Sequence, residues 1–183
     1  MTPDERAEWL GIRVRSVRKH MPAVFAAATL DDDQVEAWCA DLVAGRRSPL
    51  ILNGNIGAGK THTAWACWPH LIGLGWIGSF HGLSEQDLLD SYLPGGDRAR
   101  GDKASIVDLL LLDDLGSAAL SDWSRARLTA LIDQRWQHQR ATIITTNMPS
   151  ADMASHLGDR ATSRIAQGAT TVRVVGADRR TTA

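Results

Sequence analysis

Residues 49–63 read PLILNGNIGAGKTHT, and this stretch contains the pattern G-x-x-x-x-G-K-[ST] between a short apolar run and a helical pattern. The order strand, loop, helix predicts a phosphate-binding loop, because glycines let backbone N–H groups crowd around phosphate oxygens with no Cβ in the way. The helix that follows adds its own free N–H groups and the positive end of its dipole. The predicted binding residues are Gly54, Asn55, Ile56, Gly57, Ala58, Gly59, Lys60, Thr61 and His62.

Two residues of this loop have predicted chemical roles. The ammonium group of Lys60 is expected to reach the β- and γ-phosphates of a nucleotide, and the hydroxyl of Thr61 to take one position on Mg²⁺. A glycine-rich turn with an accidental lysine is the alternative. The apolar run before the loop and the helix after it argue against that alternative.

Residues 106–114 read IVDLLLLDD, which predicts a strand that is buried on both faces and ends in two carboxylates. A buried carboxylate needs a compensating charge, and a metal ion at the carboxyl edge of the sheet supplies one. Asp113 is therefore expected to hold Mg²⁺ through water, and Asp114 to polarise the attacking water. The alternative is an acidic turn at a strand end that runs into Gly116.

Residues 141–147, ATIITTN, predict a strand that ends in Asn147 and lies beside the Asp113 strand. That position brings Asn147 near the γ-phosphate, although a turn-forming asparagine before Met148-Pro149 is the alternative. Further strands are expected at 76–80 and 170–175, helices at 2–21, 31–45 and 121–138, and a mobile loop at 94–105. The fold class is therefore α/β: a P-loop domain with a parallel five-stranded sheet between helices, in which one strand is inserted between the phosphate-loop and Asp113 strands.

The 183 residues fit one globular domain, and their composition, with 44% hydrophobic residues and a net charge of −1, is ordinary for such a domain. That balance gives no global reason to expect a nucleic-acid partner. Neither a signal peptide nor a membrane span is predicted, and Cys39 and Cys67 form no metal or disulfide pattern, so a reducing cytoplasmic location is expected. Residues 1–21 are expected to form a separate basic helix. Its charges are better explained by a solvated helix face than by a contact with nucleic acid or a protein partner. The basic residues of the 94–105 loop could follow a phosphate backbone, but solvated loop charges are commoner.

Five ordered segments resemble the AAA+ ATPases of the DnaC-type helicase loaders and the related IstB-type transposition helpers. GNIGAGKT resembles their Walker A, LLLLDDLG their Walker B, TTN their sensor 1, GDRATSRI the segment bearing the arginine finger, and VVGADRR the closing G-x-D-x-R. MPAVFAAATL is similar to the lead-in that helps wall the adenine pocket. The resemblance covers residues 22–183 as one ATPase domain, and it departs from the family in having little room for an N-terminal helicase-binding domain or a C-terminal lid.

The resemblance implies ATP and Mg²⁺ as cofactors and adds two residue roles. Asn147 is expected to position the hydrolytic water, and Arg164, with Arg160 as the second candidate, to reach the ATP of the next subunit in a homo-oligomer. No clear sensor-2 arginine is found, although Arg179 could substitute.

The implied function is an ATPase that loads or remodels a replicative helicase on single-stranded DNA. Three alternatives stay open: a transposition helper on duplex DNA, an ATP-gated binding module that hardly hydrolyses, and a small-molecule kinase. The kinase is disfavoured because neither a phosphoacceptor pocket nor a basic lid is found.

Overall fold

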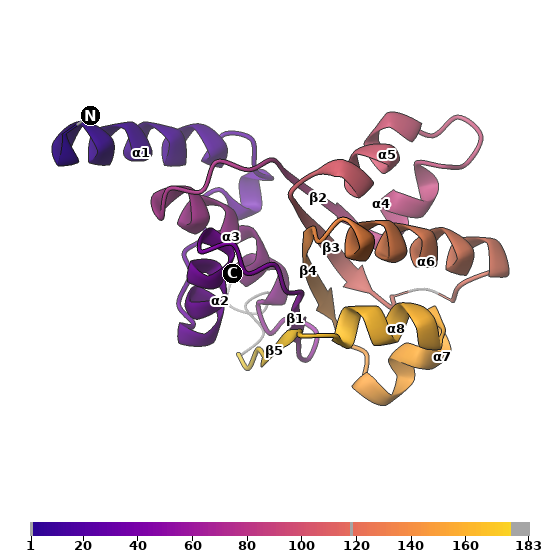
Figure 1. Cartoon of the computed structure of the whole chain (residues 1–183). Coiled ribbons are helices and arrows are strands. Elements are labelled where there is room, and N and C mark those ends of the chain that lie inside the picture. The colour runs from indigo at the N-terminus through magenta and orange to yellow at the C-terminus, as the bar shows by residue number, and fades with distance from the viewer. Residues whose placement is uncertain (1, 118, 177–183) are drawn as a thin grey trace.

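A computed structural model describes residues 2–117 and 119–176 of the chain as a five-stranded parallel sheet between two groups of helices (Figure 1). The strands are β1 (Leu50–Asn53), β2 (Phe80–Ser84), β3 (Leu109–Leu115), β4 (Ala141–Thr146) and β5 (Thr170–Arg173). The helices are α1 (Pro3–Arg18), α2 (Asp33–Val43), α3 (Lys60–Gly73), α4 (Glu85–Asp90), α5 (Arg98–Ile106), α6 (Asp122–Gln137), α7 (Met153–Leu157) and α8 (Asp159–Ala166), with 3₁₀ turns at Ala23–Phe25 and Ser150–Asp152. The predicted fold class is confirmed.

The strand order is β2-β3-β4-β1-β5, and all the pairs are parallel. β4 lies between the phosphate-loop strand β1 and the aspartate strand β3, which confirms the predicted insertion of one strand between them. Because the strands are parallel, their carboxyl ends meet at one edge of the sheet. This edge is where the loops after β1, β3 and β4 come together.

The two faces of the sheet bury alternate residues of the same strands. Leu109 and Leu111 of β3 pack with α2 and α3, whereas Leu110 and Leu112 pack with the helices from α4 to α8. Figure 1 shows α1, α2 and α3 on one side of the sheet and the remaining helices on the other. This double covering explains why β3 reads as a continuous leucine run.

Helix α1 projects from this body and buries none of its residues completely. Its start is fixed by a capping box, in which the Thr2 hydroxyl and the Glu5 carboxylate each accept a backbone N–H of the other residue. Its end is fixed by Arg18, which donates to the carbonyls of Ala26 at 2.6 Å and Ala28 at 3.0 Å. Arg18 therefore ties the helix to the segment that leads into α2.

The second strand was predicted at residues 76–80, but β2 begins four residues later, at Phe80. Gly75 has φ +94°, and the N–H of Trp76 still donates to Leu71 at 2.9 Å, so the first residues of that stretch close the end of α3. Pairing with β3 starts only at Phe80, opposite Leu109. The apolar residues after α3 are therefore a helix cap and not a strand.

The predicted mobile loop at 94–105 is wrong from Arg98 onward, where helix α5 begins. Asp97 caps the helix by accepting the N–H of Arg100 at 3.2 Å. Gly101 is required inside the helix because an added Cβ would lie 2.2 Å from Oγ of Ser91. Close packing thus overrides the low helix propensity of a glycine-rich segment.

Within residues 2–117 and 119–176, none of the helices is long and apolar enough to cross a membrane.

Candidate nucleotide site

The loop between β1 and α3 has a backbone that needs its glycines. Gly57 and Gly59 have φ +80° and +98°, a region that side chains disfavour. At Gly54 an added Cβ would lie 2.3 Å from the carbonyl oxygen of Val174, just after β5. The loop is thus a tight turn that packs against the end of β5. Helix α3 begins directly after it, at Lys60.

Lys60 is the first residue of α3, and its side chain is almost buried, with 5% of the residue exposed. Its Nζ donates to the carbonyl oxygens of Gly54 at 2.9 Å and Asn55 at 2.8 Å, and also to Oδ1 of Asn147. The structure therefore brings together the lysine of the loop and the asparagine at the end of β4. Adjacency of β1 and β4 is what places them in contact.

Asp113, near the end of β3, lies beside the start of α3. Its Oδ1 accepts the hydroxyls of Thr61 at 2.9 Å and Thr145 at 2.6 Å. Burial raises the pKa of Asp113, the two hydroxyl donors oppose that rise, and the neighbouring charge of Asp114 adds to it. A hydroxyl and a carboxylate in contact are hard oxygen donors, so Thr61 and Asp113 fit the Mg²⁺ predicted from the sequence.

Asp114 is exposed and has φ +54°, in the left-handed region that few non-glycine residues adopt. The pairing of β3 with β4 shifts between Leu112 and Leu115, so Asp114 interrupts the regular ladder. Its backbone N–H donates to Oγ1 of Thr145 at 2.9 Å. The side chain of Asp114 is thus carried on a turn and reaches the same cavity as the loop.

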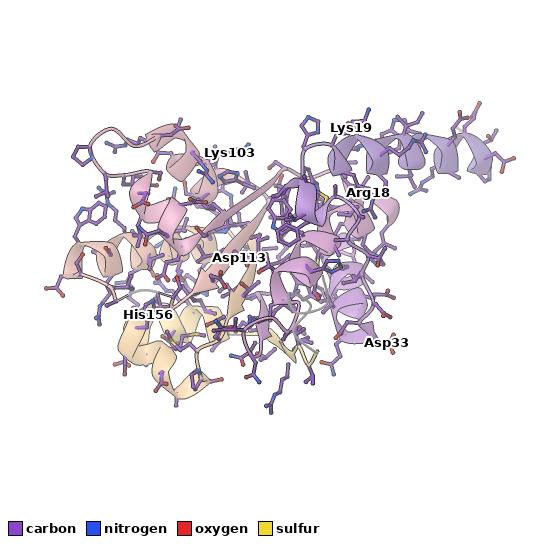
Figure 2. The ribbon with its side chains drawn as sticks, turned by 180° about the vertical axis from the view of Figure 1, so that it is seen from behind. Arg18, Lys19, Asp33, Lys103, Asp113 and His156 are labelled. Carbon is purple, nitrogen blue, oxygen red and sulfur yellow. The ribbon has the colours of Figure 1, made fainter. Side chains whose placement is uncertain are left out.

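A cavity of about 820 Å³ collects these residues at the carboxyl edge of the sheet. It is lined by Val24, Phe25, Ile56, Gly57, Gly59, Lys60, Thr61, His62, Asp113, Asp114, Ser117 and Asn147. Figure 2 shows Asp113 in the middle of the molecule, between the two groups of helices. Val24 and Phe25 come from the lead-in segment, so an apolar wall and a polar, phosphate-type loop face one cavity.

Sequence reasoning missed Thr145 and Ser117. Thr145 is completely buried and contacts both aspartates, while Ser117 lines the cavity one residue after Gly116. The threonine pair before Asn147 was a usable signal, because a hydroxyl in a buried strand needs a partner. For Ser117 the sequence has no comparable signal.

The two arginines of α8 do not line this cavity. Arg164 forms an ion pair with Asp133 of α6, and its guanidinium lies 4.5 Å from the ring centre of Trp136. Arg160 contacts the other oxygen of Asp133 at 2.9 Å, with 66% of its side chain exposed against 16% for Arg164. Both arginines are thus held by Asp133 of their own chain, Arg160 exposed and Arg164 largely buried. The predicted Arg179 lies outside the described residues.

A second cavity, of about 650 Å³, lies at the opposite edge, where β1, β4 and β5 begin. Its lining includes Arg47, Arg140 and Trp136 over a floor of core leucines and isoleucines. It shares none of its lining residues with the phosphate-type loop, but its lining includes Arg164. The predicted site residues that line the first cavity are Ile56, Gly57, Gly59, Lys60, Thr61, His62, Asp113, Asp114 and Asn147.

Together, the fold and the site define a P-loop nucleotide-binding protein of the AAA+ type. The model of the family described as IstB-like ATP binding protein matches residues 24–175. The chain belongs to this family.

The relatives agree with this assignment. A putative ATP-binding protein of insertion sequence IS1162 from Pseudomonas fluorescens is 32% identical over 154 residues, covering 76% of this chain and 65% of that protein. The replicative helicase loader DnaC of Buchnera aphidicola (Acyrthosiphon pisum) is 28% identical over 65% of this chain and 50% of that protein. The chain thus spans between half and about two thirds of the length of these relatives.

Among solved structures, a crystal structure of DnaI is similar with a TM-score of 0.71 and 23% identity, covering 87% of this chain and 94% of that chain. At that identity the likeness supports the fold alone.

Proposed function

We propose that this protein hydrolyses ATP to ADP and phosphate. The observation that carries the proposal is the contact of Lys60 with Asn147 beside the contact of Thr61 with Asp113, within one cavity. These four residues come from the start of α3, the end of β3 and the residue after β4. A phosphate-type loop with a carboxylate and an amide opposite it suits phosphoryl transfer to water, which depends on positioning and charge stabilisation.

Each residue has a separate part in this proposal. Lys60 exchanges its loop carbonyls for the β- and γ-phosphate oxygens, and the N–H groups of the loop surround the same charge. Thr61 and, through water, Asp113 would hold Mg²⁺, and the ion would supply positive charge to the phosphates. Asp114 accepts a proton from the attacking water, and Asn147 orients that water.

We further propose that activity needs assembly, because charge on the transferring phosphoryl group is stabilised by an arginine from a neighbouring subunit. Arg164 is the candidate suggested by the resemblance. Arg160 is the candidate favoured by exposure: both arginines pair with Asp133, but 66% of the Arg160 side chain is exposed against 16% for Arg164. Residues 22–183 would then form the ATPase domain and residues 1–21 a separate helical segment.

The leading role we propose is the loading or remodelling of a replicative helicase on single-stranded DNA. Support comes from the relatives named replicative helicase loader DnaC, which match about two thirds of this chain. A second role is that of a transposition helper on duplex DNA. The matching family and the 32% identical insertion-sequence protein favour this second role. A weakly hydrolysing ATP-gated binding module is a third, because Asp114 reaches less far than a glutamate would.

The test is ATP hydrolysis per subunit against protein concentration, without DNA, with single-stranded DNA and with duplex DNA. Lys60→Ala is expected to abolish binding and hydrolysis, while Lys103→Ala, which removes an exposed lysine of α5, serves as the matched control in the assay without DNA. Specific activity that rises with concentration supports assembly. Stimulation by single-stranded DNA favours the loader, and salt-sensitive stimulation by duplex DNA favours the transposition helper. Tight ATP binding without turnover would favour the third role, the ATP-gated binding module.

A further inference from the structure

The carboxylate of Glu85, at the start of α4, is almost completely buried, with 1% of the residue exposed. A buried charge is costly unless both oxygens have partners. In this protein both do: Oε2 accepts the backbone N–H of Gly116 at 2.7 Å, and Oε1 lies 2.8 Å from Nε2 of His156. One side chain of α4 therefore contacts two segments that lie far from it in the sequence, and the site described above does not explain these contacts.

The first of these segments is the turn that carries Asp114. Asp114 and Gly116 have φ +54° and +87°, and a left-handed non-glycine residue persists only when its surroundings hold it. Thr145 holds the N–H of Asp114 from the β4 side, and Glu85 holds the N–H of Gly116 from the β2 side. The turn is thus fixed at two points, one on each side of Leu115.

The second segment is the helix pair α7 and α8. The side chain of His156 on α7, 11% exposed, contacts Glu85 through Nε2. Only Leu157 and Gly158, the latter with φ +87°, separate His156 from α8. Helix α8 carries Arg160 and Arg164, so the carboxylate that holds the Asp114 turn also contacts the unit with both arginine candidates.

We propose that Glu85 is a positioning residue for ATP hydrolysis, and that with His156 it couples the placement of Asp114 to the position of α7 and α8. This inference rests on the proposed function. A contact between subunits that moves α8 would shift His156, then Glu85, then the turn of Asp114. Neither Glu85 nor His156 lines the nucleotide cavity, so their loss affects turnover and leaves ATP binding intact.

The kinetic test compares Glu85→Gln with Asp87→Asn, which removes a half-exposed carboxylate, two residues further along α4, that pairs with Arg100. Glu85→Gln is expected to lower kcat between about 10- and 100-fold with KM changed less than about 2-fold, as for lost support of a catalytic group. His156→Ala should behave alike, whereas His156→Gln, which keeps an N–H donor for Oε1, should retain most of the kcat. An unchanged kcat in folded Glu85→Gln, or a rise in KM alone, would overturn the proposal.

Hydrogen exchange of the full chain tests the same link without hydrolysis. In Glu85→Gln and His156→Ala, the amide of Gly116 should exchange faster, while the amides of β1 keep the wild-type rate. A general rise across the sheet, or no change at Gly116, would contradict the proposed link. If wild-type protein does not hydrolyse ATP, the proposed function fails, and the exchange measurement still decides whether Glu85 couples the two segments.

Discussion

At the scale of single residues, the charge of the Asp113 carboxylate serves the proposed Mg²⁺ site but lowers the stability of the fold. Its partly buried carboxylate accepts two hydroxyl donors, yet burial is the largest effect and raises its pKa. A carboxyl whose pKa is higher in the folded than in the unfolded state opposes folding when ionised. The penalty is therefore full above the folded-state pKa and disappears as the pH falls through it.

Asp113→Asn removes this charge and keeps an oxygen that can accept from Thr61 and Thr145. We expect its Tm near pH 7 to equal or exceed that of the wild type, and the difference to shrink on acidification, because protonation relieves the same penalty in the wild type. Mg²⁺-dependent ATP binding should weaken about 10-fold or more. Thermal melts between pH 7 and 4, with nucleotide titrations, measure both effects. A Tm well below wild type at pH 7 would count against the sign of this argument.

Thr145 makes the second prediction at this scale. Its hydroxyl donates to Asp113 and accepts the N–H of Asp114, so Thr145→Val keeps the shape and leaves that N–H without its acceptor. The expected cost is about 1–3 kcal/mol of unfolding free energy, together with slower hydrolysis as the Asp114 turn loosens. Urea melts and steady-state turnover check both, with Thr171→Val, an exposed threonine of β5, as the control. Equal losses in the two variants would show that β-strand context, not this hydroxyl, matters.

At the scale of elements, Arg135 of α6 ties the end of α5 to the start of β4. It is 2% exposed and donates to the carbonyls of Ala104 at 2.8 Å, Val107 at 3.0 Å and Ala141 at 2.5 Å. Burial lowers the pKa of Arg135 to about 9, so the charge itself is unfavourable there. The stabilisation comes from satisfying the last carbonyls of α5 and the first of β4.

Arg135→Met fills similar space and leaves those buried carbonyls without donors. We expect a loss of about 3 kcal/mol or more in unfolding free energy, measured by urea denaturation. Arg127→Met is the matched control, since Arg127 is an exposed arginine of the same helix that stacks over Tyr92 and Trp123. If both variants lose the same small amount, the carbonyl contacts of Arg135 are not what joins these elements.

The elements also show what sequence reasoning could reach. β3 and β4 were predictable because a leucine run and a β-branched run, each ending in polar residues, have few other solutions in an alternating α/β chain. α5 was not, since Gly101 is set by the approach of Ser91 across the chain and reads locally as a loop residue. Likewise, the contact of Lys60 with Asn147 follows from strand order, but the Asp133 partner of Arg164 depends on how α6 and α8 pack.

At the scale of the whole molecule, the cavity and the arginines of α8 occupy different parts of one chain. Asp133 pairs with both Arg160 and Arg164, so one carboxylate holds both candidates in the single subunit. Trp136 adds a stacking contact to Arg164 alone. The more exposed Arg160 can leave Asp133 at less cost, because a surface ion pair is worth only about 0–1 kcal/mol.

A mixing experiment tests whether an arginine acts across subunits. Lys60→Ala has a defective nucleotide site and intact arginines, whereas an arginine variant has an intact site. If the arginine acts in trans, mixing the two inactive proteins recovers activity, because some contacts pair an intact site with an intact arginine. We expect recovery, to roughly a quarter of wild type at equal mixing, for Arg160→Ala or Arg164→Ala, whichever residue is the finger. If both arginine variants are inactive alone and neither mixture recovers activity, an arginine acting in trans is contradicted. If both arginine variants are fully active alone, α8 has no part in catalysis.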